Sequence, residues 1–592
     1  MFFQPTRQGK YMARQTMVVL TSVLFLLAPL AFAGCGATTP IPLQFTSLNL
    51  GIPSSALNSP VTGQVADNTE MHLRITFKTD GKTMQQAQNQ KIEPGKPSHV
   101  EQLANKLGIS DQTYQRIKSF FSPTGIQLTL NKLHTHLSVE AKAKTLAKLL
   151  QTKFVNHNDN GHTFFAPSPA PKLPQFLVDH IAAVTGLDNY SAPAQHDFTM
   201  NMGTRLSAHT TRTIGNTQKP AQDCQPLDQT LLPRDVAHAY GYDQLWNKGW
   251  NGQNMTVNLV EIDGFNQSDI ANYLSCINFQ GHLSTVNVDG APSQSLGEST
   301  LDVQMVAGLA RSVNIVDYQT DGNTNGDIWV NINDMLQQIL NDNTNNASAG
   351  SVVSISLGAA EDQLDSQDIT AINQSIQQLT QIEHMTVFVA SGDCGAFTTR
   401  QYGNLSVSYP ASDTSAVAVG GTIMSIYQNQ TRARELVWSN GSNRSKCQNQ
   451  WGSGGGNSTV FQRPGWQSAN GVNNRYSRNM RQIPDISAVA YALAVYYNGQ
   501  WGAVGGTSAA APIWATGLAL VNQGLIQQIQ KYTSSPQLFY LVANRNTGNS
   551  PYFDVTQGNN LYYPATSGWD FASGLGTPNL ATFYQSLYND IK

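Results

Sequence analysis

Short runs of apolar residues alternate with amphipathic stretches from about residue 229 to the C-terminus. The amphipathic stretch between two of these runs places apolar residues at helical spacing, at Ile369, Ile372, Ile376 and Leu379. Buried strands that alternate with helices predict an α/β domain with a doubly wound, mostly parallel sheet. The predicted strands are Met255–Ile262, Val313–Tyr318, Val352–Ile355, Thr386–Ala390 and Ala416–Val419.

A separate α+β module is predicted upstream, over residues 71–190. Strands are expected at Met71–Phe77 and Ile126–Leu130, and a helix is expected to begin near Ser138. Apolar residues at helical spacing between Leu173 and Val184 predict another helix.

The segments on either side of this module have little apolar periodicity. Residues 36–70 are rich in Ser, Thr, Pro and Asn, which predicts a tether. Residues 191–228 are similarly polar, which predicts a linker.

The first 35 residues have the features of an export signal. Three basic residues precede the apolar stretch Met17–Leu30, and Ala31-Phe-Ala33 offers a small-residue cleavage site. Gly34-Cys35 resembles a bacterial lipobox, so cleavage after Ala33 and lipidation at Cys35 are both open. Either outcome predicts a secreted protein that meets a membrane only through its signal or a lipid anchor.

Composition narrows the choice of partners and environment. The net charge is −3 and only 12% of residues are charged, so nothing indicates a nucleic-acid partner. A surface with few ion pairs suits acidic surroundings. Beyond Cys35, the four cysteines permit two disulfides in three connectivities, and the absence of a CxxC pair argues against zinc. These are Cys224, Cys276, Cys394 and Cys447.

Ser508 has the features of a nucleophile. The run Gly505-Gly-Thr-Ser-Ala-Ala-Ala-Pro512 predicts a tight turn that opens into a helix with Ser508 at its N-terminus. Free backbone N–H groups and the positive end of the helix dipole meet there, which suits a group that must also stabilise an oxyanion.

Glu298 and Asp302 are the candidate partners of Ser508. They are four residues apart in a predicted helix, so both carboxylates lie on one face. Nine of the twelve histidines precede residue 228, and the other three have no recognisable catalytic context. A glutamate therefore stands where a serine peptidase ordinarily has a histidine.

The C-terminal half resembles the sedolisins, the serine-carboxyl peptidases, and the upstream module resembles their pro-domain, for which an α+β ferredoxin-like fold is expected. The resemblance implies a subtilisin-like catalytic domain over residues 229–592. The matching motifs are Glu298-x-x-x-Asp302, Ser354-Ile-Ser-Leu-Gly358, Ala390-Ser-Gly-Asp-Cys-Gly395, Tyr409-Pro-Ala411, Val419-Gly-Gly-Thr422, Gly454-Gly-Gly-Asn-Ser458, Arg481-Gln-Ile-Pro-Asp485 and Gly505-Gly-Thr-Ser508.

The resemblance also implies a role for each catalytic residue. Ser508 is the nucleophile, Glu298 its general base and Asp302 the partner that orients the base. Asp393 corresponds to the oxyanion-hole aspartate, which must be protonated to donate a hydrogen bond. Asp263 ends a strand, but without a histidine to orient we interpret it as structural. Cys394 stands beside Asp393 where serine is common in the family.

One structural calcium is implied in the same way. Its ligands are the side chains of Asp554 and Asp570 and the backbone carbonyls of Val555, Thr566 and Gly568. Carboxylates and carbonyls are the hard oxygen ligands that calcium prefers.

The sequence therefore predicts a monomeric, secreted acid endopeptidase that cuts protein or peptide substrates. Its own pro-domain is expected to inhibit it until cleavage within the linker, and seven pro-domain histidines between His72 and His180 are hypothesised to weaken that contact in acid. A tripeptidyl exopeptidase and an inactive, envelope-associated peptide-binding protein are the alternatives.

Overall fold

The computed structural model describes residues 43–90, 100–196, 199–202, 230–343, 349–398, 403–441, 446–448, 450–545 and 548–592. The expected signal peptide, with Cys35, lies outside the described residues, and so do Cys224 and most of the predicted linker. The chain divides into two units, Met1–Gln44 and Phe45–Lys592, and the second contains every helix and strand described below.

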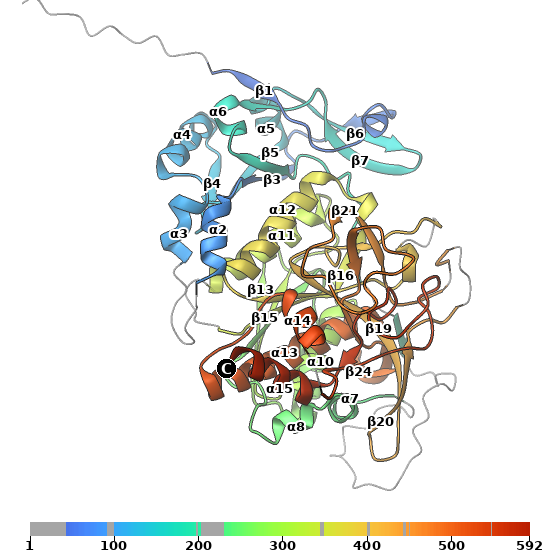
Figure 1. Ribbon diagram of the computed structural model, residues 1–592. Coiled ribbons are helices and arrows are strands. Elements are labelled where there is room, and N and C mark those ends of the chain that lie inside the picture. Colours follow the sequence, from blue (N-terminus) through green and yellow to red (C-terminus); the bar gives the residue numbers. More distant parts are fainter. Residues whose placement is uncertain are drawn as a thin grey trace, which may run out of the picture. The chain divides into compact units, whose positions relative to one another are not determined.

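A central eight-stranded sheet organises the C-terminal part, residues 230–592 (Figure 1). Its order is β13-β14-β12-β15-β17-β19-β20, and β23 also pairs with β19. All of these pairs are parallel except that of β19 with β20, so the expected doubly wound sheet is confirmed. The strands are β12 (Thr256–Glu261), β13 (His282–Asn287), β14 (Asn314–Gln319), β15 (Val352–Ile355), β17 (Thr386–Ala390), β19 (Ala416–Ile426), β20 (Arg432–Val437) and β23 (Ile486–Val489).

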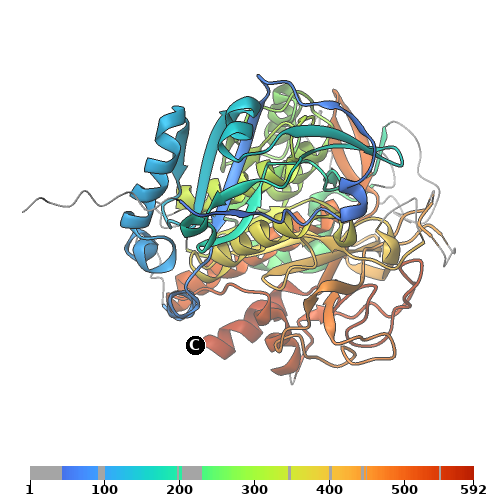
Figure 2. The ribbon, with the colours of Figure 1, turned by 90° about the horizontal axis from the view of Figure 1, so that it is seen from above.

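Helices cover both faces of this sheet (Figure 2), and alternate strand residues feed two cores. In β17, Phe388 and Ala390 belong to the core under α10 and α13, whereas Val387 and Val389 face α11 and α12. Although α13 is long and apolar enough for a membrane span, 94% of its most apolar window is buried, which identifies it as a core helix. The bounds are α10 (Glu298–Leu309), α11 (Ile328–Asn343), α12 (Ser366–Gln381) and α13 (Thr507–Ile529).

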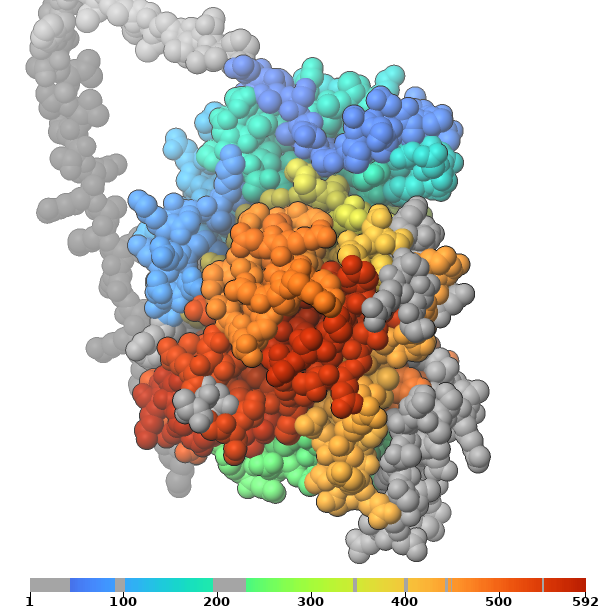
Figure 3. Space-filling view, turned by 45° about the vertical axis from the view of Figure 1, so that its right-hand side comes forward, coloured from blue at the N-terminus to red at the C-terminus, as the bar shows by residue number. Residues whose placement is uncertain are grey.

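The N-terminal part, residues 45–190, contains a four-stranded antiparallel sheet in the order β4-β5-β3-β9. Helices connect β3 to β4 and β5 to β9, which gives the expected ferredoxin-like arrangement. β9 and α2 pack against α12, and Figure 3 shows this part, in blue to cyan, against the yellow surface of the C-terminal part. The elements are β3 (Glu70–Phe77), α2 (Gly81–Gln88), α3 (Val100–Leu107), α4 (Asp111–Phe121), β4 (Gln127–Leu130), β5 (His136–Lys142), α5 (Ala143–Leu149) and β9 (Ile181–Thr185).

The expected tether over residues 36–70 is wrong from Phe45 onward. Leu50, Ile52 and Ala56 are buried in the N-terminal core, and the flanking strands pair with strands of the same part. A few apolar residues are enough to order this polar segment. Its elements are β1 (Phe45–Ser47), α1 (Ser54–Leu57) and β2 (Val61–Gln64).

Two predicted helices in the N-terminal part are also wrong. Ser138 lies in β5, and the helix begins only at Ala143. The apolar residues between Leu173 and Val184 form a strand, a one-turn helix and another strand, because β9 pairs with β3 and tertiary pairing overrides the helical spacing. These elements are β8 (Lys172–Pro174), α6 (Gln175–Val178) and β9.

The remaining elements are mostly short. The strands are β6 (Phe154–Asp159), β7 (His162–Pro167), β10 (Gln195–His196), β11 (Thr199–Met202), β16 (Leu357–Ala360), β18 (Ser408–Tyr409), β21 (Gly456–Gln462), β22 (Met480–Ile483), β24 (Leu493–Tyr497), β25 (Gln500–Gly505), β26 (Tyr552–Phe553) and β27 (Thr577–Pro578). The helices are α7 (Pro233–Tyr240), α8 (Tyr242–Trp246), α9 (Gln267–Cys276), α14 (Gln537–Arg545) and α15 (Leu580–Ile591), with 3₁₀ turns at Ser122–Thr124, Glu361–Gln363 and Gly395–Phe397.

Two of these strands, β10 and β11, lie inside the predicted linker. β10 pairs antiparallel with β16, which places His196 opposite Leu357. β11 pairs antiparallel with β25, which places Thr199 opposite Gly505. The linker is therefore held to the C-terminal part at two places.

Candidate active site

The four predicted catalytic residues follow strands of the central sheet or begin helices beside it. Glu298 is the first residue of α10 and Asp302 lies one turn later, as the sequence predicted. Asp393 follows β17, and Ser508 is the second residue of α13. The side chains of all four are buried, and only Asp393, at 6%, retains measurable exposure.

Ser356 connects the nucleophile to the acidic helix. The Ser508 Oγ donates a hydrogen bond to the Ser356 carbonyl oxygen at 3.2 Å. The Ser356 Oγ donates to Asp302 Oδ2 at 2.6 Å and lies 3.1 Å from the Ser508 carbonyl oxygen. Sequence analysis quoted Ser356 within a motif but gave it no role, because its position depends on how β15 meets α10 and α13.

Asp263 fixes the start of α10, which confirms its structural interpretation. Its carboxylate accepts hydrogen bonds from the N–H groups of Leu296, Gly297 and Ser299 at 2.7, 2.9 and 3.1 Å. Gly297 has φ of 113°, a backbone conformation that favours glycine. Capping the helix here sets the position of Glu298.

Glu261, at the end of β12, is a third buried acid beside Asp302. Burial raises the pKa of Glu261 well above its ordinary value, and the nearby charges of Asp302 and Asp317 add to this. Burial also raises the pKa of Asp302, while hydrogen bonds from Ser356 and Glu261 act in the opposite direction. Two carboxyl groups joined by a hydrogen bond share a proton. Sequence analysis missed Glu261, although an acid at the end of an otherwise apolar strand is a signal.

Asp393 is attached to the N-terminus of the nucleophile helix. Its Oδ1 accepts hydrogen bonds from the Thr507 backbone N–H at 2.8 Å and from the Thr507 hydroxyl at 2.9 Å. Thr507 immediately precedes Ser508, so the structure brings together the predicted nucleophile and the predicted oxyanion aspartate. A carboxyl group here can donate from Oδ2 when it is protonated.

An arginine of the N-terminal part makes ion pairs across the contact with the C-terminal part. The Arg74 side chain is 2% exposed and lies 2.6 Å from Asp334 and 3.5 Å from Asp289. His136 Nε2 lies 3.2 Å from Asp334 Oδ1. Protonating His136 would strengthen this contact, so the hypothesis that the histidines weaken docking in acid is wrong for this residue.

A cluster of buried acids lies farther along the same interface. The Ser191 Oγ donates to Asp368 Oδ2 at 2.5 Å and to Asp365 Oδ2 at 3.3 Å. Burial raises the pKa of Asp188 and Asp368 well above the ordinary value and raises that of Asp327 to about 7. Mutual repulsion contributes to each of these shifts, so the cluster is most stable when it is protonated.

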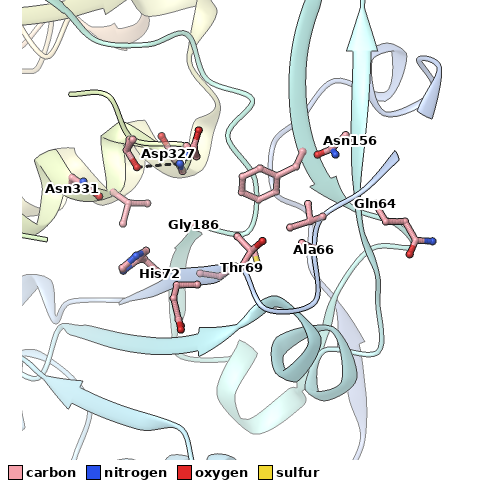
Figure 4. Close-up of a pocket in the computed structure, with 16 residues that line it drawn as sticks. Gln64, Ala66, Thr69, His72, Asn156, Gly186, Asp327 and Asn331 are labelled. Carbon is pink, nitrogen blue, oxygen red and sulfur yellow. Dashed lines mark hydrogen bonds between the residues drawn. The ribbon is translucent and has the colours of Figure 1, made fainter. Parts of the chain in front are cut away.

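A cavity of about 290 Å³ borders this cluster (Figure 4). The N-terminal part lines it with Thr69, His72 and Gly186, and the C-terminal part lines it with Asp327 and Asn331. None of the four predicted catalytic residues lines it, so the cavity belongs to the interface between the two parts.

The predicted calcium ligands lie together in two C-terminal loops. Asp554 Oδ2 accepts from the Gly568 N–H at 2.9 Å, and Asp570 Oδ2 accepts from the Thr566 N–H at 2.7 Å. The Ser573 hydroxyl lies 3.3 Å from the Val555 carbonyl oxygen and 3.1 Å from Asp570. Burial raises the pKa of Asp570 to about 7, so a bound cation would favour its ionised form.

Two carboxylates and several carbonyls match the hard oxygen donors of a calcium site. The described residues contain no group of three or more His, Cys, Asp or Glu side chains placed to hold a metal. A site built mostly from carbonyls does not require such a group, so the residues fit the predicted ion.

One disulfide is described, between Cys394 and Cys447, whose Cα atoms are 5.2 Å apart. This pairing belongs to one of the three connectivities that the sequence left open.

Comparisons with known proteins cover nearly the whole chain. The family description "Pro-kumamolisin, activation domain" matches residues 58–190, and "Subtilase family" matches residues 286–567. Kumamolisin of Bacillus sp. (strain MN-32) is 26% identical over 568 residues, which cover 90% of this chain and 94% of kumamolisin. Sedolisin of Pseudomonas sp. (strain 101) is 26% identical over 615 residues, which cover 96% and 97% of the two chains.

Two further similarities concern a mammalian peptidase and a solved structure. Human tripeptidyl-peptidase 1 is 24% identical over 532 residues, which cover 84% of this chain and 86% of that protein. The structure of Pseudomonas sedolisin complexed with two molecules of pseudo-iodotyrostatin has a TM-score of 0.51 and 26% identity, and covers 60% of this chain and 98% of sedolisin.

Proposed function

Because the chain belongs to the sedolisin and kumamolisin family of serine-carboxyl peptidases, we propose that it is a secreted acid endopeptidase, made as a zymogen that processes itself. The observation that carries this proposal is the path of residues 195–202 past the nucleophile. β10 pairs with β16, which begins one residue after Ser356, the acceptor for the Ser508 hydroxyl. β11 pairs with β25, which ends three residues before Ser508. The chain thus lies in its own cleft as a substrate would.

The acid–base chemistry follows from the buried carboxyl groups. Glu298 accepts the proton of Ser508 as the hydroxyl oxygen attacks the substrate carbonyl, and Asp302 orients Glu298. The proton then passes to the leaving amine, and water hydrolyses the acyl-enzyme by the reverse route. A carboxylate base still accepts a proton in acid, where imidazole is already charged.

Asp393 and the backbone N–H of Ser508 would stabilise the oxyanion. The hydrogen bonds from Thr507 hold Asp393 Oδ1, which supports donation from a protonated Oδ2. Removing one such donor typically lowers kcat by roughly 10²–10³-fold.

Calcium would be held by the Asp554 and Asp570 side chains and by the carbonyls of Val555, Thr566 and Gly568. None of these residues belongs to the catalytic set. The ion would therefore stabilise the two C-terminal loops.

The path of the linker also favours an endopeptidase over a tripeptidyl peptidase. Upstream of β10 the chain continues to Ser191, and the Ala192 N–H donates to the Gln363 carbonyl oxygen at 2.9 Å. At least six residues, 191–196, therefore precede the position of cleavage, whereas removal of tripeptides requires a cleft that ends after three. Peptides with free and with acetylated N-termini test this choice, because an endopeptidase cuts both.

The first experiment compares wild type with Ser508→Ala after acidification from pH 7 to pH 4. We expect wild type to lose its N-terminal part and to cut an unstructured protein, and Ser508→Ala to do neither. Thr516→Ser, a mild change on the same helix, is the matched control and should behave as wild type. If wild type also stays full-length and inactive across this range, the peptide-binding alternative is favoured.

The strand pairing also brackets the bond that is cut. His196 and Thr199 are the last and first paired residues on the two sides of Ser508, so the cut should fall among the three peptide bonds between them. N-terminal sequencing of the processed chain should therefore begin at residue 197, 198 or 199. A first cut elsewhere in the linker would mean that the pairing is not productive.

A further inference from the structure

The disulfide between Cys394 and Cys447 begins at the residue that follows Asp393. Cys394 is 5% exposed and Cys447 is fully buried. With Phe397 and Leu561 they form a small apolar cluster separate from the two main cores. The bridge therefore fastens the Asp393 loop to a second loop in a dry environment.

Backbone hydrogen bonds run between the same two loops. The Gly452 N–H donates to the Asp393 carbonyl oxygen at 2.9 Å, and the Gly454 N–H donates to the Gly392 carbonyl oxygen at 2.7 Å. A Cβ at Gly454 would lie 1.8 Å from the Ser391 carbonyl oxygen, so this close approach requires glycine. The backbone of Asp393 is thus held by the second loop.

The carboxyl group of Asp393 is held from the other side by Thr507, next to the nucleophile. Its position relative to Ser508 therefore depends on two attachments, one through its backbone and one through its side chain. Single backbone hydrogen bonds contribute little net stability, whereas a covalent bridge cannot open during turnover.

We propose that the Cys394–Cys447 disulfide positions Asp393 for oxyanion stabilisation. This inference rests on the proposed function, which gives Asp393 its catalytic role. An oxyanion donor acts only when it is preorganised within hydrogen-bond distance of the developing charge, and small displacements lower the rate strongly. Cys394 and Cys447 are positioning residues, because they act through Asp393.

The test replaces both cysteines, as Cys394→Ser with Cys447→Ser, and measures two quantities. One is the first-order rate constant of self-cleavage at pH 4, and the other is the affinity of the processed enzyme for a peptide aldehyde. Ser508 adds to the aldehyde carbonyl and its proton moves to the base, which places an oxyanion-like oxygen beside Asp393. The matched peptide alcohol binds the same cleft without this oxygen.

We expect the rate constant and the aldehyde affinity to fall about tenfold or more, within the loss of roughly 10²–10³-fold expected for removing the donor itself. Affinity for the alcohol should not change, and the variant should remain folded at the assay temperature. Cys276→Ser, which removes a different disulfide-bonded cysteine, is the matched control and should leave the ratio of aldehyde to alcohol affinity unchanged.

A double-mutant cycle with Asp393→Ala separates positioning from general stabilisation. If the bridge acts through Asp393, its removal causes no further loss of aldehyde affinity in the Asp393→Ala background. An equal further loss in that background, or equal weakening of aldehyde and alcohol, would overturn the inference. Where the serine pair does not fold, Cys394→Ala with Cys447→Ala keeps the cluster apolar and gives the same comparison.

These outcomes are distinct from failure of the proposed function. If wild type neither cleaves itself nor cuts substrate, the peptidase proposal fails. If wild type is active and Asp393→Ala weakens aldehyde binding, but the cysteine variants match wild type, only the positioning role fails.

Discussion

Replacing Arg74 by methionine tests how strongly the pro-domain is held to the catalytic domain. The substitution keeps much of the apolar stem and removes the charge that faces Asp334, Asp289 and Glu140. Asp334 is the least exposed of these three partners, at 10%, and lies 2.6 Å from the guanidinium group. The variant leaves its carboxylate buried without its main counter-charge.

Breaking a buried pair by removing one partner typically costs about 3–5 kcal/mol. At 1.4 kcal/mol for each factor of ten, this predicts weaker docking by roughly two to four orders of magnitude. The assay is size-exclusion chromatography of the self-cleaved protein at a series of dilutions. Wild type should retain its pro-domain fragment at concentrations where Arg74→Met has released it.

The effect should be the same at pH 4 and pH 7. Burial alone would raise the pKa of Asp334, but the charge of Arg74 and the hydrogen bond from His136 lower it to about 2. A lowered carboxyl pKa stabilises the contact above the ordinary value near 4, and this contribution is lost only as pH falls toward 2.

A matched surface pair provides the control. Lys144 and Asp67 are 74% and 72% exposed, so Lys144→Met should change docking by less than about 1 kcal/mol. If Arg74→Met retains its fragment as wild type does, or if Lys144→Met loses it equally, the buried pair does not hold the domains together.

Three further predictions concern the catalytic acids, the calcium loops and the disulfide. Glu261→Leu removes a hydrogen-bond donor to Asp302, so the pKa of Asp302 rises and the acidic limb of the pH–activity profile moves to higher pH, whereas Glu261→Gln keeps the donor and the profile; unchanged profiles for both would contradict this. Chelation with EGTA should lower the melting temperature, by an amount that corresponds to about 2.7 kcal/mol when calcium is at 100 times its Kd, and Asp554→Asn should abolish this sensitivity to the chelator. Cys394→Ser with Cys447→Ser opens a loop that spans a sequence separation of 53 residues, so urea unfolding should show a loss of about 4 kcal/mol, and a loss below about 1 kcal/mol would refute it.

Residues in contiguous motifs were the ones that sequence reasoning located. Ser508 sits in a run whose glycines, alanines and proline each favour a turn into a helix, and the structure begins α13 at Thr507. Glu298 and Asp302 are related by helical spacing alone, so a correct helix prediction was enough to place them together. In each case the local sequence determines the local geometry.

The residues that were missed owe their roles to contacts between distant segments. Glu261 contacts Asp302 only because β12 ends beside α10, and Ser356 reaches Ser508 only where β15 ends beside α13. The helix expected between Leu173 and Val184 fails for the same reason, since pairing with β3 decides the conformation of β9. Spacing within one segment carries no information about these partners.

Burial raises carboxyl pKa values both in the catalytic site and at the pro-domain interface, but the consequences for pH dependence differ. At the interface, the pKa of Asp327 is raised by burial to about 7, so docking is strongest below the ordinary value near 4 and weakens as pH rises toward 7. The Arg74–Asp334 pair persists down to about pH 2. Neither group releases the pro-domain on acidification. Acid must therefore start the enzyme through the chemistry of Glu298, Asp302 and Asp393, by cutting a linker that is already in the cleft, and the pro-domain departs only after that covalent tie is broken.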